Sequence, residues 1–143
     1  MLKFVFLTDQ FFCDHAQCSE IEKKQNRPHV QIFVRLNALF FCIPMRSNIH
    51  HPHVIWTDKE NHCGIDFSKA VIVTDPDKYI DKLSKPHIRE TEFKKLKRIN
   101  EYEIERGMLK YIQKYKEAKQ NLSIPRNRIL VSCSSLQYFE KYI

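Results

Sequence analysis

Residues 29–45 constrain the fold more than any other part of the chain, because they predict a β-hairpin with a defined register. The segment HVQIFVRL, 29–36, alternates apolar and polar residues, which is typical of a strand with one buried face. Asn37-Ala38 then suits a two-residue turn into a second apolar run, LFFCIPM, 39–45. Pairing across this turn puts the apolar side chains of both strands on one face. The opposed pairs are Leu36 with Leu39, Val34 with Phe41, Ile32 with Ile43, and Val30 with Met45.

The same register predicts a polar cluster at the open end of the hairpin. His29 falls opposite Arg46 on the second face, and Ser47 adjoins Arg46. The chain continues through a loop, 47–53, that adds an asparagine and three histidines. We therefore expect the functional groups of this chain to gather where the hairpin ends.

The rest of the sequence predicts an α+β fold in a single compact domain, 1–143. Strands are predicted at 2–7, 53–57, 67–75 and 128–133, with a turn at 58–64. Helices are predicted at 9–16, from Asp75 to about Leu83, at 91–119 with a break at Gly107, and at 135–143. Thr8 is suited to cap the first helix. Ser19 and Glu22 have capping-box spacing, which predicts a further helical turn through Lys24.

The charge of the chain indicates an anionic partner. Its 24 Lys and Arg against 17 Asp and Glu leave a net charge of +7, which favours nucleic acid first and an acidic membrane surface second. No apolar run reaches the length of a membrane span, and MLKFVFLTDQFF lacks a small-residue cleavage site, so neither a membrane segment nor a signal peptide is expected. Five cysteines without CxxC spacing favour reduced thiols and a cytoplasmic location. Two glycines are too few for a glycine-rich phosphate loop.

His29, Arg46, Ser47 and His50 together predict a ribonuclease that needs no metal and no cofactor. RNA carries its own nucleophile, the 2′-hydroxyl, so the protein has to orient it, move protons and stabilise charge on phosphorus. Histidine transfers protons near neutral pH, and the guanidinium of arginine matches a phosphate. Serine can hold a phosphate oxygen or the 2′-hydroxyl.

Two other interpretations of these residues stay open. A histidine at a strand start and an Arg-Ser-Asn loop are also typical of a solvated surface, which would leave a non-catalytic RNA-binding module. A zinc-dependent protein is the other alternative, because five potential ligands occur close together, although without a zinc signature. These ligands are His50, His51, His53, His62 and Cys63.

Three motifs resemble one family of toxins. NRPHV (26–30), IPMRSNI (43–49) and GIDFSKAVIV (64–73) resemble the TenpN branch of type III toxin–antitoxin toxins, relatives of the ToxN, AbiQ and CptN endoribonucleases. The likeness extends over most of residues 1–120. It implies an α+β fold with a strongly twisted antiparallel sheet, like that of the MazF and Kid toxins. It also implies sequence-selective cleavage of RNA without metal, leaving a 2′,3′-cyclic phosphate.

The resemblance also implies roles for single residues. The catalytic serine of the family falls on Ser47, and the hydroxyl residue that often precedes it is replaced here by Arg46. A basic family residue falls on His29. A family lysine falls on Ile49, so His50 would have to supply its function, and a family tyrosine falls near Phe11, which cannot donate a hydrogen bond.

The partners implied are RNA molecules, with no membrane and no DNA. They are a cellular or phage RNA substrate and an RNA antitoxin of repeated pseudoknots, which closes with the toxin into a ring-like assembly that acts in abortive infection by phage. A basic helix face in FKKLKR, 93–98, favours the same kind of partner. The expected RNA contacts are Arg27, Arg35, Asn48, Ser68, Lys69, Lys94, Lys95 and Arg98.

Overall fold

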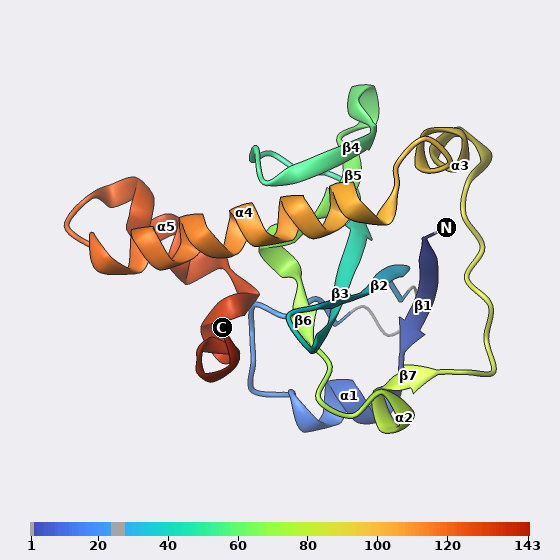
Figure 1. Ribbon diagram of the computed structural model, residues 1–143, viewed down its shortest axis with the longest axis horizontal. Coiled ribbons are helices and arrows are strands. Elements are labelled where there is room, and N and C mark those ends of the chain that lie inside the picture. Colours follow the sequence, from blue (N-terminus) through green and yellow to red (C-terminus); the bar gives the residue numbers. More distant parts are fainter. Residues whose placement is uncertain (1, 24–27) are drawn as a thin grey trace.

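The hairpin predicted from residues 29–45 forms the centre of the sheet (Figure 1). The computed structural model describes residues 2–23 and 28–143. In it β2 (Gln31–Leu36) pairs antiparallel with β3 (Leu39–Arg46), and Leu36 faces Leu39 as predicted. Asn37 and Ala38 have positive φ angles of 51° and 63°, which a two-residue hairpin turn requires. The register prediction is therefore confirmed.

Around this hairpin the described residues form a seven-stranded sheet in which every pairing is antiparallel. The strand order is β4-β5-β3-β2-β1-β7, with β6 paired to β3. The further strands are β1 (Lys3–Leu7), β4 (Val54–Asp58), β5 (Cys63–Asp66), β6 (Val71–Ile72) and β7 (Ile80–Asp81). The expected α+β fold with an antiparallel sheet is thus confirmed.

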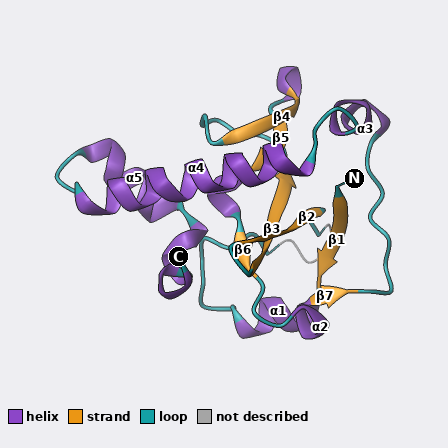
Figure 2. Cartoon of the chain, in the orientation of Figure 1, coloured by secondary structure: helices purple, strands orange, loops and turns teal. Residues whose placement is uncertain are grey.

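Helices surround the sheet, and the longest of them crosses it (Figure 2). They are α1 (Asp9–Asp14), α2 (Pro76–Tyr79), α3 (Glu90–Leu96), α4 (Glu101–Gln120) and α5 (Pro125–Cys133). Ile104 and Met108 of α4 are fully buried in the same core as Ile32 and Ile43 of the hairpin. Short 3₁₀ turns lie at Lys59–Asn61, Phe67–Lys69, Ser135–Tyr138 and Glu140–Tyr142. No helix in the described part of the chain is both long and apolar enough to cross a membrane.

The strand predicted at 128–133 is wrong, because these residues belong to α5. Pro125 occupies the first turn of α5, where its fixed φ angle and missing N–H are tolerated. The β-branched residues that suggested a strand have no sheet neighbour here, and α5 buries none of its residues. The helix predicted at 135–143 is replaced by two 3₁₀ turns.

The break predicted at Gly107 lies instead between α3 and α4, at 97–100. Asn100 starts α4 because its side chain accepts a hydrogen bond of 2.9 Å from the Glu103 N–H. Gly107 lies inside α4 for a packing reason. A Cβ atom there would lie 2.4 Å from Cζ of Phe67, so only glycine lets that ring pack against the helix.

The strand predicted at 67–75 shrinks to β6, since Phe67–Lys69 form a 3₁₀ turn. The expected turn at 58–64 is partly wrong, because β5 begins at Cys63. Asp75 caps α2 as predicted, but the helix ends at Tyr79. The next two residues pair with Phe6 and Leu7 of β1, and this long-range pairing ends the helix.

The N-terminal helix is confirmed with a shorter range. Thr8 caps α1 by accepting a hydrogen bond from the Phe11 N–H. The turn predicted from Ser19 to Lys24 forms no helix over the described residues, where a single turn is closed by the Ile21 N–H and the Cys18 carbonyl. Lys24 lies outside the described residues.

Candidate active site

The open end of the hairpin borders a groove of about 670 Å³, called groove A below. Three segments meet there: the residues before β2, the end of β3 with Ser47, and residues 87–92 leading into α3. The lining polar residues are His29, Arg46, Ser47, His87, Arg89 and Glu92. The structure therefore brings together three of the four catalytic residues predicted from the sequence.

Arg46 lies between two carboxylates. Its Nη1 donates to Oδ2 of Asp66 at 2.5 Å, and its Nη2 donates to Oε1 of Glu22 at 2.9 Å. Its Nε is buried and has no partner among the described residues. This guanidinium is fixed in place, and its buried Nε–H donor stays unsatisfied.

His29 is held by the backbone of the opposite strand. Its Nδ1 donates to the Met45 carbonyl at 3.1 Å, so in the neutral ring Nε2 carries no proton. Nε2 is buried, forms no hydrogen bond to a described residue, and lies 3.8 Å from Oε2 of Glu22. The predicted proximity of His29 and Arg46 is thus confirmed, with Glu22 in contact with both.

Glu22 is ionised in this arrangement. The imidazole of His29 and the charge of Arg46 hold the pKa of Glu22 below its ordinary value of 4.5. Burial acts in the opposite direction but is outweighed. The carboxylate thus adds a negative charge between two groups that would otherwise attract a phosphate.

Asp66 supports groove A from the interior. It is fully buried at the end of β5, and its carboxylate accepts hydrogen bonds from Arg46, from the Ser68 N–H at 2.9 Å and from the Ser68 hydroxyl at 2.6 Å. Nε2 of His51 lies 3.1 Å away. Burial alone would raise the pKa of Asp66, but the hydrogen bonds from His51, Ser68 and Arg46 outweigh it and lower that pKa below 3.8.

Asp66, His51 and Ser68 are the residue types of a nucleophilic triad, but they lack its geometry. In a triad the serine and the carboxylate contact opposite imidazole nitrogens. Here Oγ of Ser68 and the carboxylate both contact Nε2, at 3.2 and 3.1 Å, and Nδ1 accepts from the His53 N–H at 3.1 Å. Ser68, which is expected to contact RNA, is buried and holds Asp66 in place.

His50, the fourth predicted catalytic residue, lies outside the lining of groove A. Its Nε2 lies 2.7 Å from Oδ1 of Asn48, and its ring centre lies 4.7 Å from that of His62. The ring centres of a second pair, His51 and His53, lie 5.5 Å apart. No group of three or more His, Cys, Asp and Glu in residues 2–23 and 28–143 could hold a metal ion. The residues proposed as zinc ligands are therefore not gathered into one site.

Groove A also contains His87 and Arg89, which the sequence analysis missed. His87 is exposed on the segment that runs from β7 to α3 (Figure 1). Arg89 pairs with Glu92 at 2.6 Å, and buried Glu92 accepts a hydrogen bond of 2.5 Å from Thr57. The motif KPHIRE, 85–90, carries the right residue types. Only the long-range fold brings them to the hairpin.

The predicted RNA contacts fall into two groups. Lys69 is engaged in intramolecular contacts, since its Nζ donates to Glu20 at 2.9 Å and to the Cys133 carbonyl at 2.8 Å. Arg27 lies outside the described residues. The remaining predicted contacts are exposed, namely Arg35, Asn48, Lys94, Lys95 and Arg98. Of these, Lys94, Lys95 and Arg98 lie at α3, beside the exposed ring of Phe93 that Lys97 approaches to 4.8 Å.

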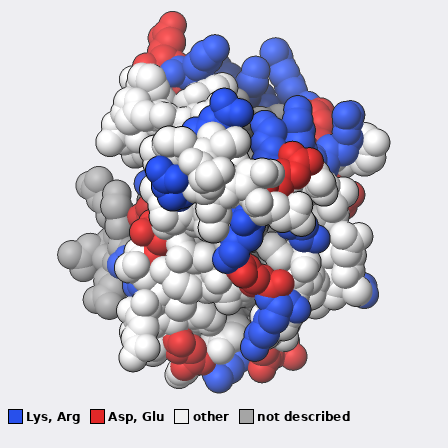
Figure 3. Space-filling view, turned by 90° about the vertical axis from the view of Figure 1, so that its left-hand side faces the viewer, with Lys and Arg blue, Asp and Glu red and all other residues white. Residues whose placement is uncertain are grey.

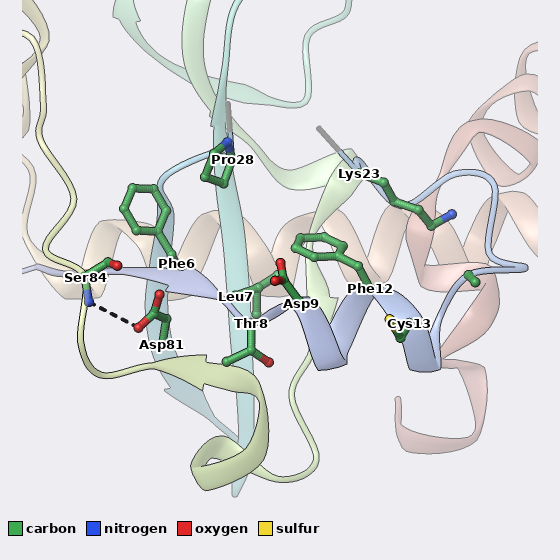
Figure 4. Close-up of a pocket in the computed structure, with 11 residues that line it drawn as sticks. Phe6, Leu7, Thr8, Asp9, Phe12, Cys13, Lys23, Pro28, Asp81 and Ser84 are labelled. Atoms are coloured by element: carbon green, nitrogen blue, oxygen red, sulfur yellow. Dashed lines mark hydrogen bonds between the residues drawn. The ribbon is translucent and has the colours of Figure 1, made fainter. Parts of the chain in front are cut away.

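Two other grooves among the described residues are larger than groove A. One of about 850 Å³ runs along β1 and α1, where Phe6, Phe12 and Pro28 lie among Asp9, Lys23 and Asp81 (Figure 4). Asp81 there accepts backbone hydrogen bonds from Leu83 and Ser84. The other, of about 750 Å³, is called groove B and lies between residues 51–53, α4 and α5. Of the three, groove A has the lining that fits acid–base chemistry on a phosphate.

The chain matches no protein-family model, no curated protein and no solved structure. Its function is therefore inferred from the site.

Proposed function

We propose that this protein is an endoribonuclease that cleaves RNA by transesterification and needs no metal ion. The observation that supports the proposal is the lining of groove A, where two histidines, two arginines and a serine occur together. These residues supply proton transfer, charge stabilisation and ribose orientation, which are the tasks of this reaction.

The carboxylate of Glu22 marks the position of the substrate phosphate. It is an anion held by Arg46 at 2.9 Å and lies 3.8 Å from Nε2 of His29. A phosphate that displaces it gains the arginine fork and the unsatisfied Nε of the same side chain. Glu22 precedes the hairpin on a segment without helix or strand, so its side chain can leave without breaking a strand.

In the proposed reaction the 2′-oxygen attacks phosphorus and the bond to the 5′-oxygen breaks. One histidine accepts the proton of the 2′-hydroxyl, and another gives a proton to the departing 5′-oxygen, which leaves a 2′,3′-cyclic phosphate and a 5′-hydroxyl. We assign proton acceptance to Nε2 of His29 and proton donation to exposed His87. Arg46 stabilises charge on phosphorus, and Ser47 orients the ribose.

Cleavage of a mixed-sequence RNA by purified variants tests this proposal. His29→Gln and His87→Gln should each lower the cleavage rate about 10²- to 10⁴-fold, because each removes a proton-transfer group. Ser47→Ala should also slow cleavage while leaving the fold intact, because Ser47 is exposed. Mass spectrometry of the products should show a cyclic phosphate end.

His50→Gln is the matched control, because His50 is an exposed histidine outside groove A. This variant should cleave RNA at the wild-type rate. Cleavage should also persist in EDTA. Wild-type rates in all three groove A variants would overturn the proposal, and loss of activity in EDTA with recovery on adding zinc would favour the zinc-dependent alternative.

The three motifs that resemble TenpN toxins support a more specific role. We propose a sequence-selective toxin of a type III system in the cytoplasm, with a strongly twisted sheet like that of MazF and Kid. A repeated pseudoknot RNA would inhibit it by covering groove A and the basic face of α3, which carries Lys94 and Lys95. Expressed alone, the chain should arrest growth and Ser47→Ala should relieve the arrest. Short tandem repeats directly upstream of the gene would support the antitoxin.

A further inference from the structure

Groove B lies on the other side of Asp66 from groove A. Oδ2 of Asp66 accepts from Arg46, which lines groove A. Oδ1 contacts His51 and Ser68, which line groove B. The carboxylate of Asp66 thus connects the lining of groove B with that of the proposed cleavage site.

One wall of groove B is aromatic. The rings of His51 and His53 are stacked with centres 5.5 Å apart, and His53 meets Tyr111 edge-on at 5.3 Å. Burial, together with the charges of His51 and Lys114, lowers the pKa of His53 below its ordinary value of 6.5. His53 is therefore neutral at pH 7 and offers a flat, uncharged ring.

Another part of the lining is aliphatic and exposed. Ile129 of α5 is 64% exposed and Ile124, just before α5, is 38% exposed, and both line groove B. A lining that combines aromatic and aliphatic side chains suits a flat, largely apolar ligand such as a nucleobase.

Two cations that also line groove B, Lys114 and Arg126, fit the phosphates on either side of such a base. Neither forms an ion pair with a carboxylate in the described part of the chain. Glu117 also lines the groove, and its carboxylate accepts a hydrogen bond of 3.0 Å from Gln113. Figure 3 shows the end of the molecule where α5 lies, with Lys and Arg side chains concentrated over its upper half.

Two asparagines give groove B a preference among bases. Nδ2 of Asn121 donates to the Glu117 carbonyl at 3.2 Å, and Nδ2 of Asn127 donates to the Asn121 carbonyl at 3.0 Å. No described residue donates to the side-chain oxygen of either asparagine, so both oxygens can accept a hydrogen bond from a ligand. They match the exocyclic amino group of cytosine, adenine or guanine, which uracil lacks.

We propose that groove B binds one amino-bearing nucleobase of single-stranded RNA, with Lys114 and Arg126 on the flanking phosphates. The inference rests on the proposed function, for which groove B would be the base-selecting subsite. Stacking and phosphate contacts give affinity, and the asparagine oxygens select the base.

Binding of fluorescent 2′-O-methyl hexanucleotides tests this subsite. These probes lack the nucleophile, so fluorescence anisotropy reports binding without cleavage. We expect hexacytidine to bind at least about fivefold more tightly than hexauridine, because one hydrogen-bonded amino group distinguishes them. Ile129→Asn and Lys114→Gln should each weaken hexacytidine binding by about fivefold or more.

The control variants lie on α4 outside the lining of groove B. Lys116→Gln removes the same charge two residues from Lys114, and Leu109→Asn removes an exposed aliphatic side chain. Both should bind hexacytidine like the wild type. Equal binding of the two probes, or wild-type binding by the groove variants, would overturn the subsite even if the protein cleaves RNA. Selective binding without any cleavage would overturn the nuclease and keep the subsite.

Discussion

Groove A and groove B both contain histidine, serine and a cation, yet the two sets of side chains are used differently. In groove A, His29 keeps Nε2 unpartnered and Ser47 is exposed. In groove B, both nitrogens of His51 are engaged and Ser68 is buried against Asp66. Residue types alone therefore do not identify a catalytic group. The side chain that keeps an unsatisfied atom is the one available for chemistry.

Replacing Asp66, which contacts residues of both grooves, should have the largest effect on stability. Asp66→Ala leaves Arg46 without its buried partner and should lower the free energy of unfolding by about 3–5 kcal/mol. Urea unfolding followed by circular dichroism measures the loss. Asp77→Ala, which breaks an exposed pair with Lys82, is the control and should leave the transition unchanged.

Acid should weaken the same network by a smaller amount. The pKa values of Asp66 and Glu22 are lowered in the folded protein, so their stabilisation is complete above the unfolded-state values of 3.8 and 4.5. It should be lost as the pH falls from those values through the lower folded-state pKa values. Urea unfolding between pH 7 and pH 3 measures this loss. A stability that rises on acidification would contradict the ionised network.

The smallest effect should separate the two serines. Ser68→Ala removes a buried hydrogen bond to Asp66 and should cost about 1–2 kcal/mol of unfolding free energy. Ser47→Ala should change that free energy by less than about 0.5 kcal/mol, because Ser47 is exposed. The rate of RNA cleavage should show the reverse order, because Ser47→Ala should slow cleavage more than Ser68→Ala does. If Ser68→Ala lost only cleavage and no stability, the contrast between the grooves would fail.

The part of the site that the sequence predicted is the part made by local pairing. A two-residue turn fixed which residues of β2 and β3 face each other, and this brought His29 to Arg46. The helix caps at Thr8 and Asp75 likewise depend on only a few neighbouring residues. The pairing of Ile32 with Ile43 depends on one hairpin.

The part that the sequence did not predict depends on distant segments. His87 reaches groove A only because β7 pairs with β1 and directs residues 82–89 toward α3. Asp66 gains its role from Arg46 and His51, and no spacing within GIDFSKA shows either contact. RILVSC, 128–133, has the composition of a strand, but it packs beside α4 and pairs with no strand of the sheet.

The contacts between residues 68–70 and residues 133–135 have a consequence for the stability of the site. The hydroxyl of Ser135 donates to the carbonyls of Ser68 and Ala70, and Lys69 reaches the carbonyl of Cys133. The segment next to the buried carboxylate is thus anchored by residues 133–135, so fraying of these residues should loosen Asp66 and, through it, the guanidinium of Arg46.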